Sequence, residues 1–168
     1  MQLGMVGLGR MGSNLVRRLL RAGHECVAYD VNADVVAGLA GEGATGAESL
    51  DELVSKLTPP RAVWVMVPAG RITEQTVSAL AERLAADDAI IDGGNSYYRD
   101  DIARAKELAG KGIHYVDVGT SGGVWGIDRG YCMMIGVDKQ AVEHLDPIFD
   151  ALAPGIGDIP VTPGRSAA

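Results

Sequence analysis

The sequence predicts an α/β fold in which helices cover both faces of a mostly parallel sheet. Apolar segments of strand length alternate with amphipathic segments of helical period along the whole chain. The 168 residues correspond to about one domain, and 47% hydrophobic and 22% charged residues are typical of a folded globular protein. Glycine is unusually frequent, at 23 residues, and its short clusters indicate places where the backbone approaches another group closely.

The first 30 residues predict a strand–helix–strand unit. Residues 3–7 form an apolar segment that ends in glycine, and residues 25–30 form a second segment of strand length. Between them, apolar residues at every fourth position give one buried helix face: Met11, Leu15 and Leu19. Gly23 ends this helix, as glycine commonly does at a helix C-terminus.

The same alternation continues to residue 152. Ser49, followed three residues later by Glu52, is a capping-box signal for a helix that reaches residue 57. Further strands are expected at 62–67, 89–92, 113–118 and 131–136, and further helices at 72–84, 100–108 and 142–152. The buried face of the helix at 72–84 is expected to consist of Ile72, Thr76, Leu80 and Leu84. We therefore expect one domain over residues 1–163 and a tail over residues 164–168.

Sulfur-containing residues are expected in the interior. Cys26 and Cys132 lie in apolar segments far apart in the sequence, so reduced interior thiols are favoured over a disulfide. The methionines of the expected strands are also assigned to the core: Met5, Met66, Met133 and Met134.

Composition excludes several classes of function. The net charge of -7 disfavours a nucleic-acid partner, because an acidic surface repels a phosphate backbone. The longest apolar run, residues 62–67, is far shorter than the ~20 residues that cross a bilayer, so no membrane association is expected. No signal peptide is visible, which makes the cytoplasm the expected location. His24, His114 and His144 lack ligand spacing, so no metal site is expected.

A glycine-rich motif lies where the first strand meets the first helix. It comprises Gly7, Leu8, Gly9, Arg10, Met11 and Gly12. The first glycine allows a tight turn, the second lets a pyrophosphate approach the backbone, and the third lets the helix pack closely on the strand. Backbone amides at the helix N-terminus then bind the anion. A strand before the motif and a helix after it predict a Rossmann-type, doubly wound sheet that binds a dinucleotide.

Asp30 ends the second strand, 23 residues after Gly7, near the spacing of the acid that binds the adenosine ribose. A carboxylate there accepts hydrogen bonds from the ribose hydroxyls and repels a 2′-phosphate. We therefore expect NAD and not NADP. The alternative is that Asp30 only caps the turn at Asn32.

Two more polar clusters follow expected strands. One spans residues 92–96 and contains Asn95, and the other spans residues 117–123 and contains Ser121, Gly122 and Gly123. Ligands of open parallel sheets bind beyond the carboxyl ends of the strands, so both clusters are expected at the crevice of the glycine loop. An amide, a hydroxyl and bare backbone N–H groups suit a carboxylate ligand.

These motifs together resemble a known family. The stretch from Val6 to Asn14 resembles the opening signature of the β-hydroxyacid dehydrogenases. Within them, the Asp-Gly-Gly-Asn-Ser run at 92–96 and the Ser-Gly-Gly run at 121–123 are similar to 6-phosphogluconate dehydrogenase. The runs Asp-Val-Asn at 30–32 and Val-Trp-Gly at 124–126 depart from the NADP-dependent form and resemble the NAD-preferring bacterial branch.

The resemblance implies NAD-dependent oxidative decarboxylation of 6-phosphogluconate, a phosphorylated sugar acid, to ribulose 5-phosphate in the pentose phosphate pathway and gluconate utilization. It also implies that Asn95 contacts substrate and nicotinamide, and that Ser121, Gly122 and Gly123 bind the substrate. The cofactor would lie along the loop of Val67, Pro68 and Ala69.

In the family, the general-base lysine belongs to a Lys-x-x-His-Asn run and, like the acid glutamate, lies on a helical second domain that also forms the dimer. No such run occurs in these 168 residues. The chain is therefore expected to be the cofactor domain without the catalytic helical domain, and to be inactive alone. A homo-oligomer is left open.

Other assignments stay open at this stage. The chain could be another β-hydroxyacid dehydrogenase, a non-catalytic dinucleotide sensor, or a methyltransferase that uses the glycine loop for S-adenosylmethionine. Trp125, between glycines, either packs on a ligand or plugs an apolar gap. Tyr97 and Tyr98 begin a helix after Asn95, and either hydroxyl could face the crevice.

Overall fold

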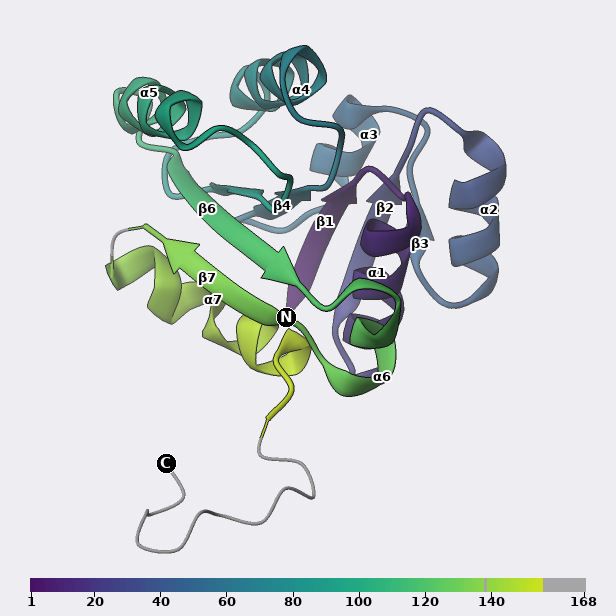
Figure 1. The fold of residues 1–168 in the computed structure, drawn as a ribbon. Coiled ribbons are helices and arrows are strands. Elements are labelled where there is room, and N and C mark those ends of the chain that lie inside the picture. The colour runs from purple at the N-terminus through teal and green to yellow at the C-terminus, as the bar shows by residue number, and fades with distance from the viewer. Residues whose placement is uncertain (138, 156–168) are drawn as a thin grey trace, which may run out of the picture.

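The computed structural model describes residues 1–137 and 139–155, and within them one sheet has the strand order β3-β2-β1-β4-β5-β6-β7 (Figure 1). The strands are β1 (Gln2–Val6), β2 (Glu25–Tyr29), β3 (Thr45–Gly46), β4 (Ala62–Val65), β5 (Ala89–Asp92), β6 (His114–Ser121) and β7 (Cys132–Gly136). All neighbouring pairs are parallel except β6 and β7. The predicted mostly parallel, doubly wound sheet is therefore confirmed.

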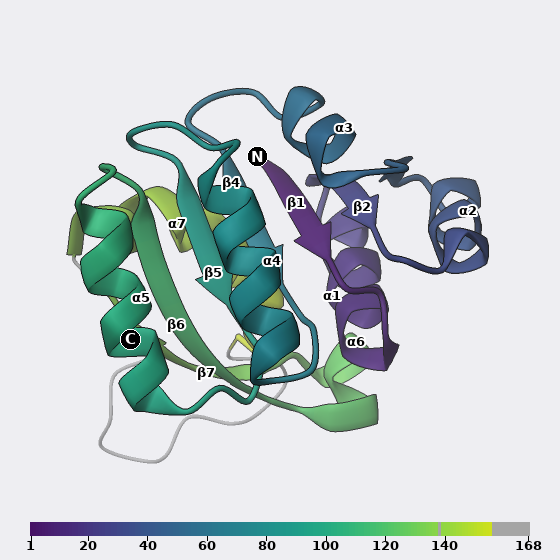
Figure 2. The ribbon, with the colours of Figure 1, turned by 90° about the horizontal axis from the view of Figure 1, so that it is seen from above.

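Helices cover both faces of this sheet (Figure 2). They are α1 (Arg10–Arg21), α2 (Ala33–Gly41), α3 (Leu50–Ser55), α4 (Arg71–Ala81), α5 (Tyr98–Ala109), the 3-10 helix η1 (Gly123–Trp125), α6 (Gly126–Arg129) and α7 (Lys139–Leu152). One apolar core lies between the sheet and α1 and α7, and the other lies between the sheet and α3, α4 and α5. Such a two-sided cover is what continuous apolar strands require.

Strand β4 shows how one strand serves both cores. Its four residues are all buried. Trp64 belongs to the core of α1 and α7 and meets the Phe149 ring edge-on at 6.3 Å between ring centroids. Its neighbours Val63 and Val65 belong to the other core, because successive side chains of a strand point to opposite faces.

Two short elements between β2 and α3 were missed by the periodicity. Helix α2 is rich in alanine and glycine, and β3 has only two residues, so neither produces a clear apolar pattern. A local signal for α2 does exist. The Asn32 side chain caps the helix by accepting a hydrogen bond from the Asp34 amide at 3.1 Å. The predicted cap at Ser49 is confirmed, since its hydroxyl accepts from the Glu52 amide at 3.1 Å.

The predicted buried face of α4 was partly wrong. Ile72 is 49% exposed, whereas its neighbour Thr73 is fully buried. The Thr73 hydroxyl donates a hydrogen bond to the Pro68 carbonyl at 3.0 Å, which allows this polar residue to be buried. A prediction from the spacing of apolar residues does not take such a hydrogen bond into account. Leu80 and Leu84 are buried as predicted.

The interior assignment of two sulfur-containing residues was also wrong. Cys26 is buried, and burial raises its pKa to about 12, but Cys132 is exposed and Met134 is 72% exposed. Both thiols are free. The physical reason is that β7 is an edge strand whose alternate residues are exposed. Its inward-facing partners Met133 and Ile135 pack against the core of α1 and α7.

The tail predicted at 164–168 and the domain boundary before it lie outside the described residues. In the described part of the chain, no helix has the length and apolar character needed to cross a bilayer.

Gly12 sets how closely α1 approaches the loop after β1. A Cβ atom there would overlap the Gly7 carbonyl, so we expect Gly12→Ala to lower the free energy of unfolding by about 1–3 kcal/mol. The matched control is Gly38→Ala in α2, where no atom lies within 4 Å of the added Cβ, and a change of at most about 1 kcal/mol, in the stabilising direction, is expected. Urea denaturation measures both. Equal stabilities for Gly12→Ala and the parent would contradict the close approach.

Candidate functional site

A groove of about 650 Å³ lies beyond the carboxyl ends of β1, β4 and β5. Its lining comes from residues 9–12, 66–69, 93–95 and 119–121, together with Met134. The groove therefore gathers four segments that are far apart in the sequence, and its size is typical of a small-molecule site.

The glycines of the first loop have different roles. Gly7 has a positive φ of 94°, and a Cβ atom on it would overlap the Met66 carbonyl, so it is required for the turn and the packing. Gly9 has a φ of -60°, and a Cβ on it would meet no atom within 4 Å. Gly9 therefore lines the open side of the loop, where only a ligand would need the space.

The first turn of α1 presents unused hydrogen-bond donors to the groove. No described residue accepts a hydrogen bond from the amides of Arg10, Met11 or Gly12, and the first turn contains no acidic residue. The Ser13 hydroxyl donates to the Leu8 carbonyl at 2.6 Å and holds the loop against the helix. Free amides at the positive end of a helix dipole are suited to bind an anion.

Asp30 is bound to this loop through its side chain. Its Oδ2 accepts a hydrogen bond from the Leu8 amide at 2.6 Å, and its Oδ1 accepts one from the Asn32 amide at 2.9 Å. The turn at Asn32 is therefore capped, as the alternative interpretation proposed. Because each carboxylate oxygen has two acceptor sites, capping leaves one free on each for a further donor.

The loop after β5 is built around Asp92. Its Oδ1 accepts from the Gly94 amide at 2.9 Å, and its Oδ2 accepts from the Ser96 hydroxyl at 2.8 Å. Gly93 must be glycine because a Cβ would overlap the indole nitrogen of Trp64. Asn95 is exposed and lines the groove, so the residue of this loop that was expected at the crevice does lie there.

The cluster after β6 is only partly brought to the groove. Ser121 lines it, but Gly122 and Gly123 do not. A Cβ on Gly122 would come within 2.7 Å of the Tyr131 ring, and Gly123 has a positive φ of 51°, so local packing and backbone conformation account for both glycines.

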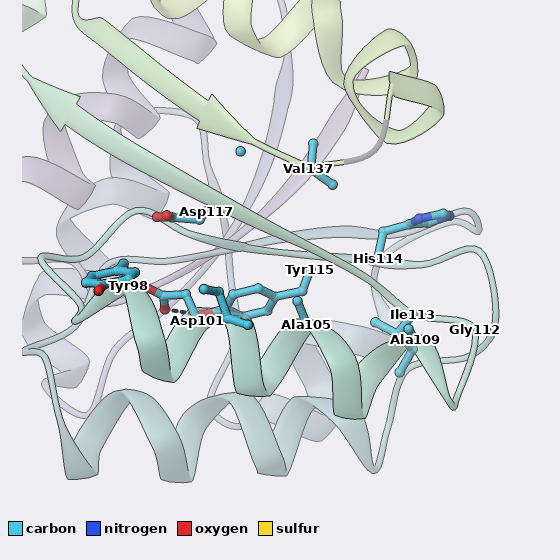
Figure 3. A pocket seen from close by; sticks show the side chains of 12 residues that line it. Tyr98, Asp101, Ala105, Ala109, Gly112, Ile113, His114, Tyr115, Asp117 and Val137 are labelled. Carbon is cyan, nitrogen blue, oxygen red and sulfur yellow. Dashed lines mark hydrogen bonds between the residues drawn. The ribbon is translucent and has the colours of Figure 1, made fainter.

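The aromatic candidates lie outside the groove lining. Trp125 is 63% exposed, with the Arg129 guanidinium 5.3 Å from the ring centroid, which excludes a buried plug. Tyr97 and Tyr98 are exposed, and their rings meet edge-on at 5.1 Å between centroids. Tyr98 lines a separate cavity of about 600 Å³ between α5 and the strands β6 and β7 (Figure 3).

Sequence patterns missed a buried polar cluster beneath the loop after β5. The Tyr115 hydroxyl lies 2.8 Å from Asp92 Oδ2 and 2.9 Å from Asp101 Oδ1, so its single proton is shared between two carboxyl groups (Figure 3 shows the Asp101 contact). Arg104 lies 3.0 Å from Asp101 and 3.6 Å from Asp92 through Nη1. The only hint was the acid–arginine pair at i, i+3 on α5, a spacing that is common on solvated helices.

Burial controls the ionisation of this cluster. It raises the pKa of Asp101 above the ordinary range, and the nearby Asp92 carboxylate adds to the effect. Burial also raises the pKa of Asp117, and the carboxylates of Asp101 and Asp92 act in the same direction. Over residues 1–137 and 139–155, this cluster included, no group of three or more His, Cys, Asp or Glu side chains is placed to hold a metal ion.

Comparison with known proteins shows a consistent set of relatives. Over residues 2–159 the chain matches the family described as the NAD binding domain of 6-phosphogluconate dehydrogenase. It is 44% identical over 155 residues to the NAD(+)-dependent, decarboxylating 6-phosphogluconate dehydrogenase of Haloferax volcanii, covering 92% of this chain and 51% of that protein. It is 36% identical to the NADP(+)-dependent enzyme of Bacillus subtilis, covering 96% of this chain and 35% of that protein. The chain thus spans between about a third and a half of these relatives.

Solved structures agree. The 6-phosphogluconate dehydrogenase of Plasmodium falciparum superposes with a TM-score of 0.87 at 26% identity, covering 95% of this chain and 36% of that one. The 3-hydroxyisobutyrate dehydrogenase of Salmonella typhimurium superposes with a TM-score of 0.83 at 27% identity, covering 91% of this chain and 54% of that one.

The raised pKa of Asp101 predicts a pH-dependent stability. The folded chain retains this proton above pH ~3.9, where the unfolded chain has begun to lose it, so stability falls as pH rises from there through the folded-state pKa. Asp101→Asn should lack this pH-dependent part of the free energy of unfolding. Between pH ~3.9 and the folded-state pKa, the parent should therefore lose stability relative to the variant. Urea denaturation from pH 4 to 7 measures it, and Asp100→Asn, at the exposed neighbouring residue, should keep the parent's profile. Parallel profiles for the parent and Asp101→Asn would contradict the assignment.

Proposed function

Since the chain belongs to the family of NAD-binding domains of 6-phosphogluconate dehydrogenase, we propose that it binds NAD for the oxidative decarboxylation of 6-phosphogluconate to ribulose 5-phosphate in the pentose phosphate pathway. The observation that carries the proposal is the row of unused amides at residues 10–12, facing a groove in which Gly9 leaves space for a ligand. The groove segments at 67–69 and 93–95 would then receive the rest of the dinucleotide.

The diphosphate would be held by the backbone at Gly9, Arg10, Met11 and Gly12. The helix dipole and the amides supply the favourable charge there, so no basic side chain is required. Arg10 lines the same groove, and its guanidinium would be available to a phosphate oxygen. Val67, Pro68 and Ala69 supply the apolar side of the groove along which the cofactor would lie.

Asp30 favours NAD over NADP. Its two backbone hydrogen bonds fix the carboxylate beside the glycine loop, so it cannot turn away from a 2′-phosphate without losing them. The following residues, Val31 and Asn32, carry no positive charge that could neutralise such a phosphate. The relatives include both NAD(+)- and NADP(+)-dependent enzymes, so the proposed choice of cofactor rests on these residues.

When bound, the nicotinamide accepts a hydride from the substrate. The residues of this chain would orient the reactants. Asn95 lines the groove in the loop that follows Asp92, and its side-chain amide can both donate and accept hydrogen bonds. Ser121 also lines the groove and offers a hydroxyl, and the amides of Gly122 and Gly123, which lie outside the groove lining, follow it directly in the chain. We assign these four residues to the sugar-acid substrate.

A placed base or acid contributes about 10²–10⁴-fold to such a reaction. The Lys-x-x-His-Asn run that carries the base in the family does not occur among these 168 residues. We therefore propose that this chain alone binds NAD with little or no turnover of 6-phosphogluconate.

Gly9→Ala tests the proposed site without disturbing the fold. The backbone of Gly9 suits alanine and no atom lies within 4 Å of the added Cβ, so the free energy of unfolding should fall by no more than about 1 kcal/mol, the preference of an N-cap for glycine over alanine. The methyl group would occupy the space proposed for the diphosphate, and the Kd for NAD should rise at least about tenfold. Isothermal titration calorimetry measures it, with Gly38→Ala as the control. Unchanged NAD affinity in Gly9→Ala would refute the proposed site.

A further inference from the structure

A buried network of hydrogen bonds and ion pairs lies beneath the loop that carries Asn95. At its centre is Asp92, only 1% exposed, whose two oxygens bind the Gly94 amide and the Ser96 hydroxyl on either side of Asn95. The carboxylate therefore holds the loop at residues 94 and 96 simultaneously, and Asn95 is left between two fixed points.

Asp92 is itself held from α5 and β6. Tyr115 contacts its Oδ2 at 2.8 Å, and Arg104 Nη1 lies 3.6 Å from the same atom. Arg104 is in turn bound by Asp101 at 3.0 Å and, through Nε, by Glu74 of α4 at 2.9 Å. The contacts thus extend from the loop through β5, β6 and α5 to α4.

The stability of the core does not explain this network. Asp92, Asp101, Arg104 and Tyr115 are all at least nine-tenths buried, and buried ion pairs are commonly no more stabilising than apolar residues of the same size. What the network provides is a fixed orientation of the loop, because each oxygen of Asp92 accepts a hydrogen bond from a defined loop donor. Apolar residues could fill the volume but could not fix the orientation of Gly94 and Ser96.

We propose that Asp92 is a positioning residue for the Asn95 loop, and that Tyr115 and Arg104 act through it by keeping its carboxylate oriented toward Gly94 and Ser96. The predicted effect on ligand binding rests on the proposed function, since it takes Asn95 to contact the nicotinamide or the substrate. That Asp92 fixes the loop follows from the contacts alone.

Tyr115→Phe removes the hydroxyl that orients Asp92 and keeps the ring. The matched control is Tyr131→Phe, because the Tyr131 hydroxyl is also buried but has no hydrogen-bond partner among the described residues. Amide hydrogen exchange of the ligand-free protein, read by NMR, should show Gly94 exchanging at least about tenfold faster in Tyr115→Phe, with the core strands unchanged. Tyr131→Phe should leave Gly94 as in the parent.

Ligand titration separates positioning from stability. ADP-ribose lacks the nicotinamide and so would not reach the Asn95 loop. Tyr115→Phe should raise the Kd for NAD about three- to tenfold, as expected for one lost hydrogen bond, and leave the Kd for ADP-ribose within about twofold. A merely structural role would weaken both ligands equally.

A second variant pair keeps the test open if Tyr115→Phe fails to fold. Ser96→Ala removes one of the two loop contacts of Asp92 and should speed the exchange of the Gly94 amide. Ser96→Thr retains a hydroxyl and should keep that exchange slow. The proposal is overturned if Gly94 exchange is unchanged in folded Tyr115→Phe and Ser96→Ala, if exchange rises uniformly over the chain in them, or if NAD and ADP-ribose weaken together. If the parent binds neither nucleotide, the proposed function fails, and Gly94 exchange alone decides whether Asp92 positions the loop.

Discussion

The close contact between α1 and the loop after β1 is the constraint on which the groove depends. Gly12 has no side chain, so the helix begins directly against the Gly7 carbonyl, and the amides of its first turn line the groove. Asp30 joins β2 to the same loop through the Leu8 amide. One small residue and one carboxylate thereby set the geometry of the anion-binding backbone.

Sheet topology explains why the groove forms at this place. β1 lies between β2 and β4, so the chain leaves β1 toward one side, and after β3 it crosses to the other side to enter β4 (Figure 1). The loops after β1 and β4 consequently diverge, and in open parallel sheets the crevice at such a switch point is where ligands bind. β5 and β6 extend the same edge, which brings Asn95 and Ser121 to the groove.

Local signals in the sequence predicted most of the elements and the glycine loop, because apolar period, caps and glycine spacing are local properties. What failed depended on distant neighbours. Met134 is apolar and yet exposed, since it lies on the edge strand β7. Gly122 was expected at the crevice, whereas it does not line the groove and the Tyr131 ring lies where its Cβ would be. The contacts of Asp92 with Tyr115 and Arg104 join separate elements, and no spacing rule indicates them.

The most direct measurement is a crystal structure of the chain grown with NAD. We expect the diphosphate oxygens within hydrogen-bond distance of the amides at residues 10–12 and the adenosine ribose hydroxyls on the free acceptor sites of Asp30. A nucleotide bound elsewhere, for example in the cavity between α5 and β7, or a nucleotide whose ribose does not contact Asp30, would contradict this assignment of the groove.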